Sequence, residues 1–247
     1  MTLSHIESIW WDFDDTLYPE SKEWKKAALE HLVVAFANKF YDGVLNEQIR
    51  SQYHGVIVGG FGSNNSAWSY LQKLPEGTDL SEISNHTEIS VLVSTYHRRT
   101  PTDPEFVEKI IDQEDRAKYL QPDQQIIEMF EEFRRNFPQL PHNIFSNSTE
   151  WSVERLMEHL EIQKEWFVNL LFCDGETILK KPDPSGYRRI TEIEQFKPNE
   201  ILYVGDSNTK DIAPANQVGL TTVKVWSNEP SQATVTVNHP KELLQYF

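Results

Sequence analysis

An apolar strand that runs into closely spaced carboxylates, near the start of the chain, constrains the fold most. Residues 8–11 read Ser-Ile-Trp-Trp, a short β-branched and aromatic run of the kind that forms a buried strand. Asp12 and Asp14 follow directly. Because aspartate is depleted in strands and rarely buried without a partner, both residues belong at the carboxyl end of this strand. In open α/β sheets, that end is where ligands bind.

The two-residue spacing of Asp12 and Asp14 allows both carboxylates to face the same side of an extended chain. Two acids that converge on one cleft repel each other, so a cation, a shared proton or a bound substrate must offset the repulsion. A lone Asp-x-Asp is more often an ordinary polar transition from strand to loop. The functional interpretation therefore depends on the rest of the chain.

Strands and helices alternate regularly from about residue 122 onward. This spacing is typical of right-handed βαβ units and predicts an α/β fold with a doubly wound parallel sheet. The Asn147-x-x-Glu150 spacing also predicts a capping box at the start of one helix. After the first strand, the predicted strands are 143–145, 167–172, 201–204, 221–225 and 235–237, and the predicted helices lie around 126–133, 153–160, 187–190, 211–217 and 242–244.

The predicted sheet is divided by a long insertion. Its first strand lies at the amino terminus, and its partners begin only near residue 142. The intervening residues read as mainly helical, with an amphipathic helix expected over 22–40. We therefore predict a core formed by residues 1–18 and 120–247 and an inserted helical block formed by residues 19–119. Inserted at this point, the block would lie over the end of the first strand.

Net charge and cysteine content limit the classes of partner and the compartment that we expect. The 247 residues include 38 acidic and 23 basic ones, a formal net charge of −15. This charge argues against a nucleic-acid backbone or an anionic membrane as the main partner. The single cysteine, Cys173, excludes an intrachain disulfide and favours a reducing compartment. Small substrates remain possible, because a local site can be cationic on an acidic protein. With no apolar run approaching 18 residues, we expect a cytoplasmic protein. Nothing in the sequence indicates its oligomeric state.

Polar side chains follow four of the predicted strands. Taken alone, each group has an ordinary explanation, as a turn, a helix cap or a surface lysine. Because the carboxyl ends of parallel strands gather at one edge of a sheet, we expect these groups to form one site. They are Asp12 with Asp14, Ser146 with Asn147, Lys181, and Asp206 with Asp211.

These residue types suit phosphoryl transfer assisted by Mg²⁺. Magnesium prefers oxygen ligands, so Asp12 and Asp206 can hold it, with Asp211 as a further ligand or as a partner of the ligands. The metal, Lys181 and the Ser146 hydroxyl with nearby N–H groups could each bind one phosphoryl oxygen. One carboxylate can act as a nucleophile and form an aspartyl phosphate. A second can protonate the leaving oxygen and later take a proton from water.

The same segments resemble, in order, the four motifs of the haloacid dehalogenase superfamily. They are residues 12–17 (Asp-Phe-Asp-Asp-Thr-Leu), 146–147, 181–184 (Lys-Pro-Asp-Pro) and 204–212, which contains Gly-Asp-Ser and a later Asp-Ile. The resemblance implies a Rossmann-like core with a helical type 1 cap. It further implies that Asp12 is the nucleophile, Asp14 the general acid and base, and that residues 146–147 and Lys181 bind the phosphoryl group. Mg²⁺ would lie on Asp12, the Asp14 backbone carbonyl and Asp206.

The resemblance also bears on the substrate. Dehalogenases of the superfamily lack the second aspartate of the first motif, so Asp14 favours phosphate chemistry. Residues 11–21 look particularly like pyrimidine 5′-nucleotidase-like members, although Gly59 stands where a basic cap residue is expected. We therefore expect a phosphatase, with a nucleoside 5′-monophosphate as the first substrate to test. The alternatives are a sugar-phosphate or phosphoglycolate phosphatase, a phosphomutase, and a non-catalytic binding protein on the same fold.

Overall fold

The computed structural model describes residues 2–19, 21–24, 115–173, 178 and 181–247. The chain divides into two compact units, Met1–Glu20 with Leu120–Phe247, and Ser21–Tyr119. All of the residues at the predicted strand ends belong to the first unit. Of the predicted helix 22–40, only residues 22–24 are described, and they are helical. The remainder of that helix and Gly59 lie outside the described residues, and the predicted domain limits stay predictions.

Six parallel strands form one sheet within the described residues, in the order β3-β2-β1-β4-β5-β6. β1 pairs with β2 on one side and with β4 on the other. Every strand predicted from the sequence is present, and the predicted doubly wound sheet is confirmed. The bounds are Ser8–Trp11 for β1, His142–Ser146 for β2, Phe167–Phe172 for β3, Ile201–Gly205 for β4, Thr221–Lys224 for β5 and Val235–Thr236 for β6.

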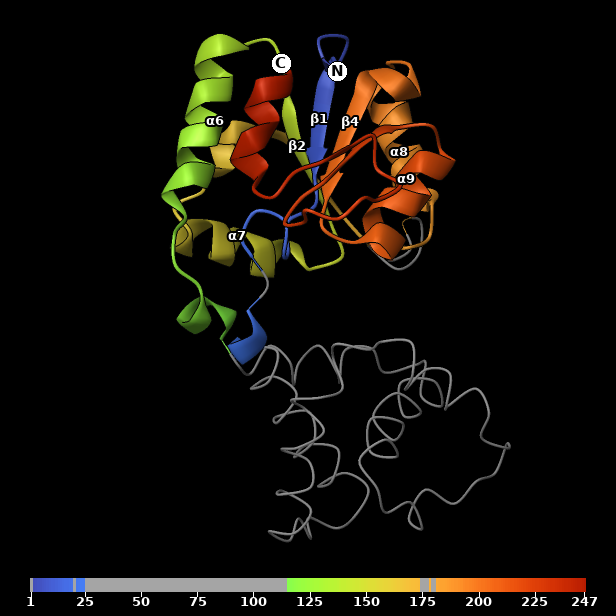
Figure 1. Ribbon diagram of the computed structural model, residues 1–247. Helices are drawn as coiled ribbons and strands as arrows, with labels where there is room; N and C mark the ends of the chain where they lie inside the picture. The colour runs from blue at the N-terminus through green and yellow to red at the C-terminus, as the bar shows by residue number, and fades with distance from the viewer. Residues whose placement is uncertain (1, 20, 25–114, 174–177, 179–180) are drawn as a thin grey trace, which may run out of the picture. The chain divides into compact units, whose positions relative to one another are not determined.

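Helices cover both faces of this sheet. Figure 1 shows α6 and the short C-terminal 3-10 helix on one side of the strands and α8 and α9 on the other. In the described part of the chain, no helix is both long enough and apolar enough to cross a membrane. The bounds are Gln124–Asn136 for α6, Glu150–His159 for α7, Ser185–Glu194 for α8, Ala213–Gln217 for α9 and Pro240–Tyr246 for the 3-10 helix.

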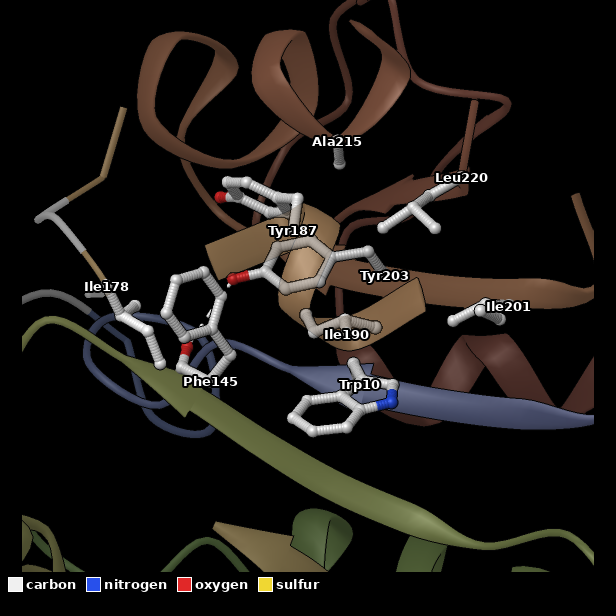
Figure 2. Close-up of a cluster of buried hydrophobic side chains, with 9 residues drawn as sticks. All are labelled: Trp10, Phe145, Ile178, Tyr187, Ile190, Ile201, Tyr203, Ala215 and Leu220. Atoms are coloured by element: carbon white, nitrogen blue, oxygen red, sulfur yellow. Dashed lines mark hydrogen bonds between the residues drawn. The ribbon is translucent and has the colours of Figure 1, made fainter. Parts of the chain in front are cut away.

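All four residues of β1 are buried. Because successive side chains of a strand point to opposite sides of the sheet, β1 is covered on both faces. Trp10 belongs to the apolar cluster that also contains side chains of α8 and α9 (Figure 2). Trp11 instead meets Phe130 of α6, with ring centroids 5.4 Å apart. Gly186 lets α8 approach β2 closely at Phe145, a member of the same cluster, since a Cβ on Gly186 would lie 2.1 Å from Phe145 Cζ. Helices packed on both faces thus fix β1 as a central strand.

The start of α7 differs from the prediction. Its N-cap is Thr149, whose side chain accepts a hydrogen bond from Ser152 N. The capping box predicted from Asn147 to Glu150 is therefore wrong. The Asn147 side chain is used elsewhere, because its Oδ1 accepts a hydrogen bond from Lys181 N at 2.8 Å. A partner 34 residues away in the chain has displaced the local interaction.

The strand order places β1 beside β4 although the two strands are far apart in sequence. The chain passes from β1 outward to β3, returns to β4 on the other side of β1, and continues outward to β6. Ligands of open α/β sheets bind at the carboxyl ends of the strands that flank such a reversal. Asp12 N donates a hydrogen bond to Val204 O at 2.8 Å, which extends the pairing beyond β1. Asp12 is thereby held next to the end of β4.

Candidate active site

Asp12 and Lys181 form a buried ion pair at the carboxyl end of β1. Lys181 Nζ lies 2.6 Å from Asp12 Oδ1, and the two side chains are 3% and 9% exposed. The other carboxylate oxygen of Asp12, Oδ2, accepts a hydrogen bond from Thr16 Oγ1 at 3.2 Å. The pair joins the first and third predicted motifs and fixes the orientation of the Asp12 carboxylate.

Lys181 has further acceptors around its ammonium group. It donates to Asp211 Oδ1 at 2.9 Å and to Tyr203 Oη at 3.0 Å. Burial opposes the charged form, but the charges of Asp12 and Asp211 outweigh it and raise the pKa of Lys181 above its usual range. Lys181 is therefore a fixed positive charge at neutral pH. Figure 2 shows Tyr203 with Phe145 and Tyr187 in the apolar cluster.

Three carboxylates converge beside this lysine. One oxygen each from Asp12, Asp206 and Asp211 lies within 4.8 Å of the other two. Burial raises the pKa of Asp12 to about 7; the charge of Lys181 opposes this shift and that of Asp211 adds to it. Burial, together with the charges of Asp211 and Asp12, raises the pKa of Asp206 to about 8. Within the described part of the chain, Lys181 is the one cation among these three acids, and the donor set fits a divalent cation that prefers oxygen.

Asp211 is fixed by the turn that follows β4. Its Oδ2 accepts a hydrogen bond from Ser207 N at 3.0 Å, while Lys181 occupies Oδ1. The helix predicted over 211–217 begins differently, because Asp211 lies in one turn of π-helix, Asn208–Ile212, that precedes α9. Gly205 makes room for this arrangement, since a Cβ there would lie 2.5 Å from Asp211 Cβ. Both oxygens of Asp211 thus already accept hydrogen bonds from the protein.

Hydroxyl groups converge on Asp14, in the turn after β1. Tyr18 Oη donates to Asp14 Oδ1 at 2.5 Å, and Ser148 Oγ donates to Asp14 Oδ2 at 2.5 Å. Ser146 Oγ lies 3.4 Å from the same Oδ2 and accepts a hydrogen bond from Ser148 N. Neither Tyr18 nor Ser148 was predicted from the sequence. Tyr18 lies four residues after Asp14 and Ser148 lies two residues after Ser146, and no spacing rule singles out either position.

Asn147 ties the second motif to the third. Its Oδ1 accepts from Lys181 N at 2.8 Å, and its Nδ2 donates to Lys181 O at 3.2 Å. The Asn147 side chain therefore holds the main chain of Lys181 on both sides.

The structure brings the predicted site residues together at one edge of the sheet. They come from the ends of β1, β2 and β4 and from the loop after β3, and hydrogen bonds or the carboxylate cluster link them. An arrangement of this kind can present a carboxylate nucleophile beside a fixed cation and a metal-binding set of oxygens. The residues are Asp12, Asp14, Ser146, Asn147, Lys181, Asp206 and Asp211.

A parallel sheet with this strand order and this edge defines a Rossmann-like α/β protein. The family model described as haloacid dehalogenase-like hydrolase matches residues 63–225. The chain therefore belongs to the haloacid dehalogenase-like hydrolases, as the motifs predicted.

Individual relatives are distant but cover nearly the whole chain. A curated glyceraldehyde 3-phosphate phosphatase from Methanopyrus kandleri is 23% identical over 97% of this chain and 96% of its own length. A haloacid dehalogenase-like hydrolase from Streptococcus pneumoniae superposes with a TM-score of 0.59 and 16% identity, covering 99% of each chain. A family member from Bacillus subtilis, solved with bound magnesium, gives a TM-score of 0.57 and 19% identity over 97% of each chain. The structural matches support the same fold.

Proposed function

We propose that the protein is a Mg²⁺-dependent phosphomonoester hydrolase of a small phosphorylated metabolite and works through an aspartyl phosphate on Asp12. The buried Asp12–Lys181 pair beside the carboxylates of Asp206 and Asp211 carries this proposal. It supplies an oriented carboxylate, a fixed positive charge and a set of oxygen ligands at the end of one strand.

Asp12 and Asp14 divide the chemistry between them. A carboxylate oxygen of Asp12 forms a bond to phosphorus while the bond from phosphorus to the leaving oxygen breaks, and Asp14 gives its proton to that oxygen. In the second step Asp14 takes a proton from water as the water oxygen attacks phosphorus. The bond between phosphorus and Asp12 then breaks, which releases inorganic phosphate and restores the Asp12 carboxylate.

The remaining site residues bind and neutralise the phosphoryl group. Lys181 and the Ser146 hydroxyl face the charge that spreads over its oxygens in the transition state, and the main-chain N–H of Asn147 adds a further donor. Asp12, the backbone carbonyl of Asp14 and Asp206 would hold Mg²⁺, with Asp211 supporting the cluster. When bound, the ion would neutralise phosphoryl charge and offset repulsion among the carboxylates.

Residues 19–119 would form a helical type 1 cap that covers the site during turnover. A cap inserted after β1 would exclude water while the aspartyl phosphate exists and would supply contacts to the leaving group. On this proposal, substrate choice depends mainly on the cap.

Two substrate classes are supported by separate observations. The first motif through Ser21 resembles pyrimidine 5′-nucleotidase-like proteins, which favours a nucleoside 5′-monophosphate. The similarity to a glyceraldehyde 3-phosphate phosphatase over nearly the whole chain favours a small sugar phosphate. Both classes present a phosphate monoester to the same core.

The test is phosphate release from a panel of nucleoside monophosphates, sugar phosphates, phosphoglycolate and an aryl phosphate, with Mg²⁺ and with a chelator. Release that needs the metal and peaks on one class supports the proposal and identifies the substrate class. No release from any of them overturns it in favour of a binding protein. Migration of phosphate between positions of a sugar bisphosphate would instead indicate a phosphomutase.

A further inference from the structure

We infer that Tyr18 and Ser148 are positioning residues that aim the Asp14 carboxyl group at the leaving oxygen of the substrate. The inference rests on the proposed phosphatase function and deepens it. It concerns the proton-transfer half of the reaction, to which the sequence motifs assign only Asp14.

The two hydroxyl groups hold Asp14 at both of its oxygens. Tyr18 Oη lies 2.5 Å from Oδ1 and Ser148 Oγ lies 2.5 Å from Oδ2. The donors come from different segments, the turn after β1 and the loop after β2. A carboxyl group held at both oxygens by two segments cannot rotate about its terminal torsion without losing both hydrogen bonds.

Both donors are themselves held in place. The Tyr18 ring is buried, with 1% exposure, and packs edge-on against Phe13 with ring centroids 5.7 Å apart. Ser148 N donates to Ser146 Oγ at 3.0 Å, which ties the loop after β2 to the end of that strand. Both contacts to Asp14 therefore start from fixed points of the catalytic unit.

Asp14 needs such support because it lies in a turn. The next residue, Asp15, has a left-handed backbone with φ of 60°, and the turn closes through a hydrogen bond from Leu17 N to Phe13 O. The aspartate side chain has two torsions to order, and proton transfer requires the donor within hydrogen-bond reach of the leaving oxygen. Partners that order these torsions before the substrate binds lower the cost of reaching that geometry.

Hydroxyl groups suit a residue that must exchange a proton in each half of the reaction. A hydroxyl can donate to a carboxylate and can also accept from a carboxylic acid, so its contact survives either charge state. Asp12 must stay ionised to attack phosphorus, and it is held by the ammonium of Lys181. The partners of the two aspartates thus match the different chemistry proposed for each.

The experiment compares two substrates that differ in their need for a proton. An alkyl phosphate has a poor leaving group that must be protonated, whereas p-nitrophenyl phosphate expels a stable phenolate. We expect Tyr18→Phe and Ser148→Ala each to lower kcat/KM for the alkyl phosphate about tenfold, the effect of losing one hydrogen bond to a charged group. For p-nitrophenyl phosphate the loss should stay under about twofold, because kcat/KM reports only the steps through transfer to Asp12.

Two further variants separate positioning from general loosening of the loop. Ser148→Thr keeps a hydroxyl and should restore most of the alkyl phosphate activity. Thr149→Ala removes the N-cap of α7 in the same loop but leaves both donors to Asp14, and its ratio of activities on the two substrates should equal that of the wild type.

If the wild type hydrolyses both substrates, equal losses of activity on both in the variants, or no loss on either, would overturn the positioning roles alone. A wild type that hydrolyses neither substrate would overturn the phosphatase proposal, and the positioning roles with it. The two failures are therefore distinguishable in one set of assays.

Discussion

The ammonium group of Lys181 lies 2.6 Å from the carboxylate of Asp12 in a site from which most solvent is excluded. A buried ion pair contributes little net stability, because the loss of hydration offsets much of the attraction between the charges. The pair lies at the end of the central strand, beside two further carboxylates. This position is better explained by a role in catalysis than by a contribution to the stability of the fold.

Replacing the proposed nucleophile should stop turnover without unfolding the protein. Asp12→Asn keeps the side-chain volume but removes the attacking carboxylate, so kcat should fall by at least about a thousandfold. Phosphate release measures the loss, and circular dichroism with thermal unfolding checks that the fold survives. A variant that retains most of the wild-type activity would exclude covalent catalysis by Asp12.

Removing the buried lysine should destabilise the metal-free protein. Lys181→Met leaves the carboxylates of Asp12 and Asp211 without their shared cation, at a cost of about 3–5 kcal/mol in the free energy of unfolding. Urea denaturation in the presence of a chelator measures the change. Lys197→Met is the matched control, since its ion pair with Glu200 lies on the surface, and it should unfold like the wild type. Equal behaviour of the two variants would contradict the role given to Lys181.

Magnesium should stabilise the protein more strongly as the pH rises. The pKa values of Asp12 and Asp206 are raised to about 7 and about 8 from 3.8. Between about pH 4 and pH 8 the folded metal-free protein therefore holds protons that the unfolded chain has lost, and its stability falls as the pH increases. Mg²⁺ must displace those protons, so it binds more tightly when they are absent.

Thermal unfolding with Mg²⁺ and with a chelator tests this linkage across about pH 5.5 to 8.5, a window that spans about one and a half units on either side of the Asp12 pKa. We expect the difference in Tm between the two conditions to widen toward high pH. A difference that is constant over the window, or absent, would show that these carboxylates do not bind the metal.

A buried histidine should make the core sensitive to acid. His142 Nδ1 accepts a hydrogen bond from Trp11 Nε1 at 3.0 Å, whereas its Nε2 is buried without a hydrogen-bond partner among the described residues. Burial lowers the pKa of His142 to about 3, so the unfolded chain binds a proton below about pH 6.5 that the folded protein does not. At pH 5 this should cost about 2 kcal/mol of stability relative to neutral pH.

This effect has the opposite sign to that of the carboxylates, so a variant is needed to isolate it. His142→Asn retains an acceptor for Trp11 and does not titrate. The difference between the unfolding free energies of wild type and variant, measured by urea denaturation, should shrink or reverse between pH 7.5 and pH 5, a span that crosses the pKa of a histidine in an unfolded chain. A difference independent of pH would contradict the assignment.

The parts of the site that could be predicted follow from the geometry of parallel sheets. Asp12 and Lys181 are 169 residues apart, yet both follow strands whose carboxyl ends must share one edge, so their meeting was predictable. The nature of their contacts was not, because ion pairing depends on side-chain paths that residue spacing does not encode.

The errors arose where a local rule competed with a distant partner. Asn147 and Glu150 have the spacing of a capping box, but Asn147 instead binds the main chain of Lys181, and Thr149 caps the helix. Tyr18 was missed for a related reason. Its apolar ring suits a core position, and only the fold shows that its hydroxyl reaches Asp14.

The most direct test of the account is chemical identification of the covalent intermediate. The enzyme is mixed with an excess of aryl phosphate and Mg²⁺, quenched in acid during turnover, digested and analysed by mass spectrometry. We predict a phosphoryl group on the peptide that contains Asp12, labile to hydroxylamine as expected of an acyl phosphate, and absent from Asp12→Asn. A phosphoryl group found on any other residue would contradict the central claim.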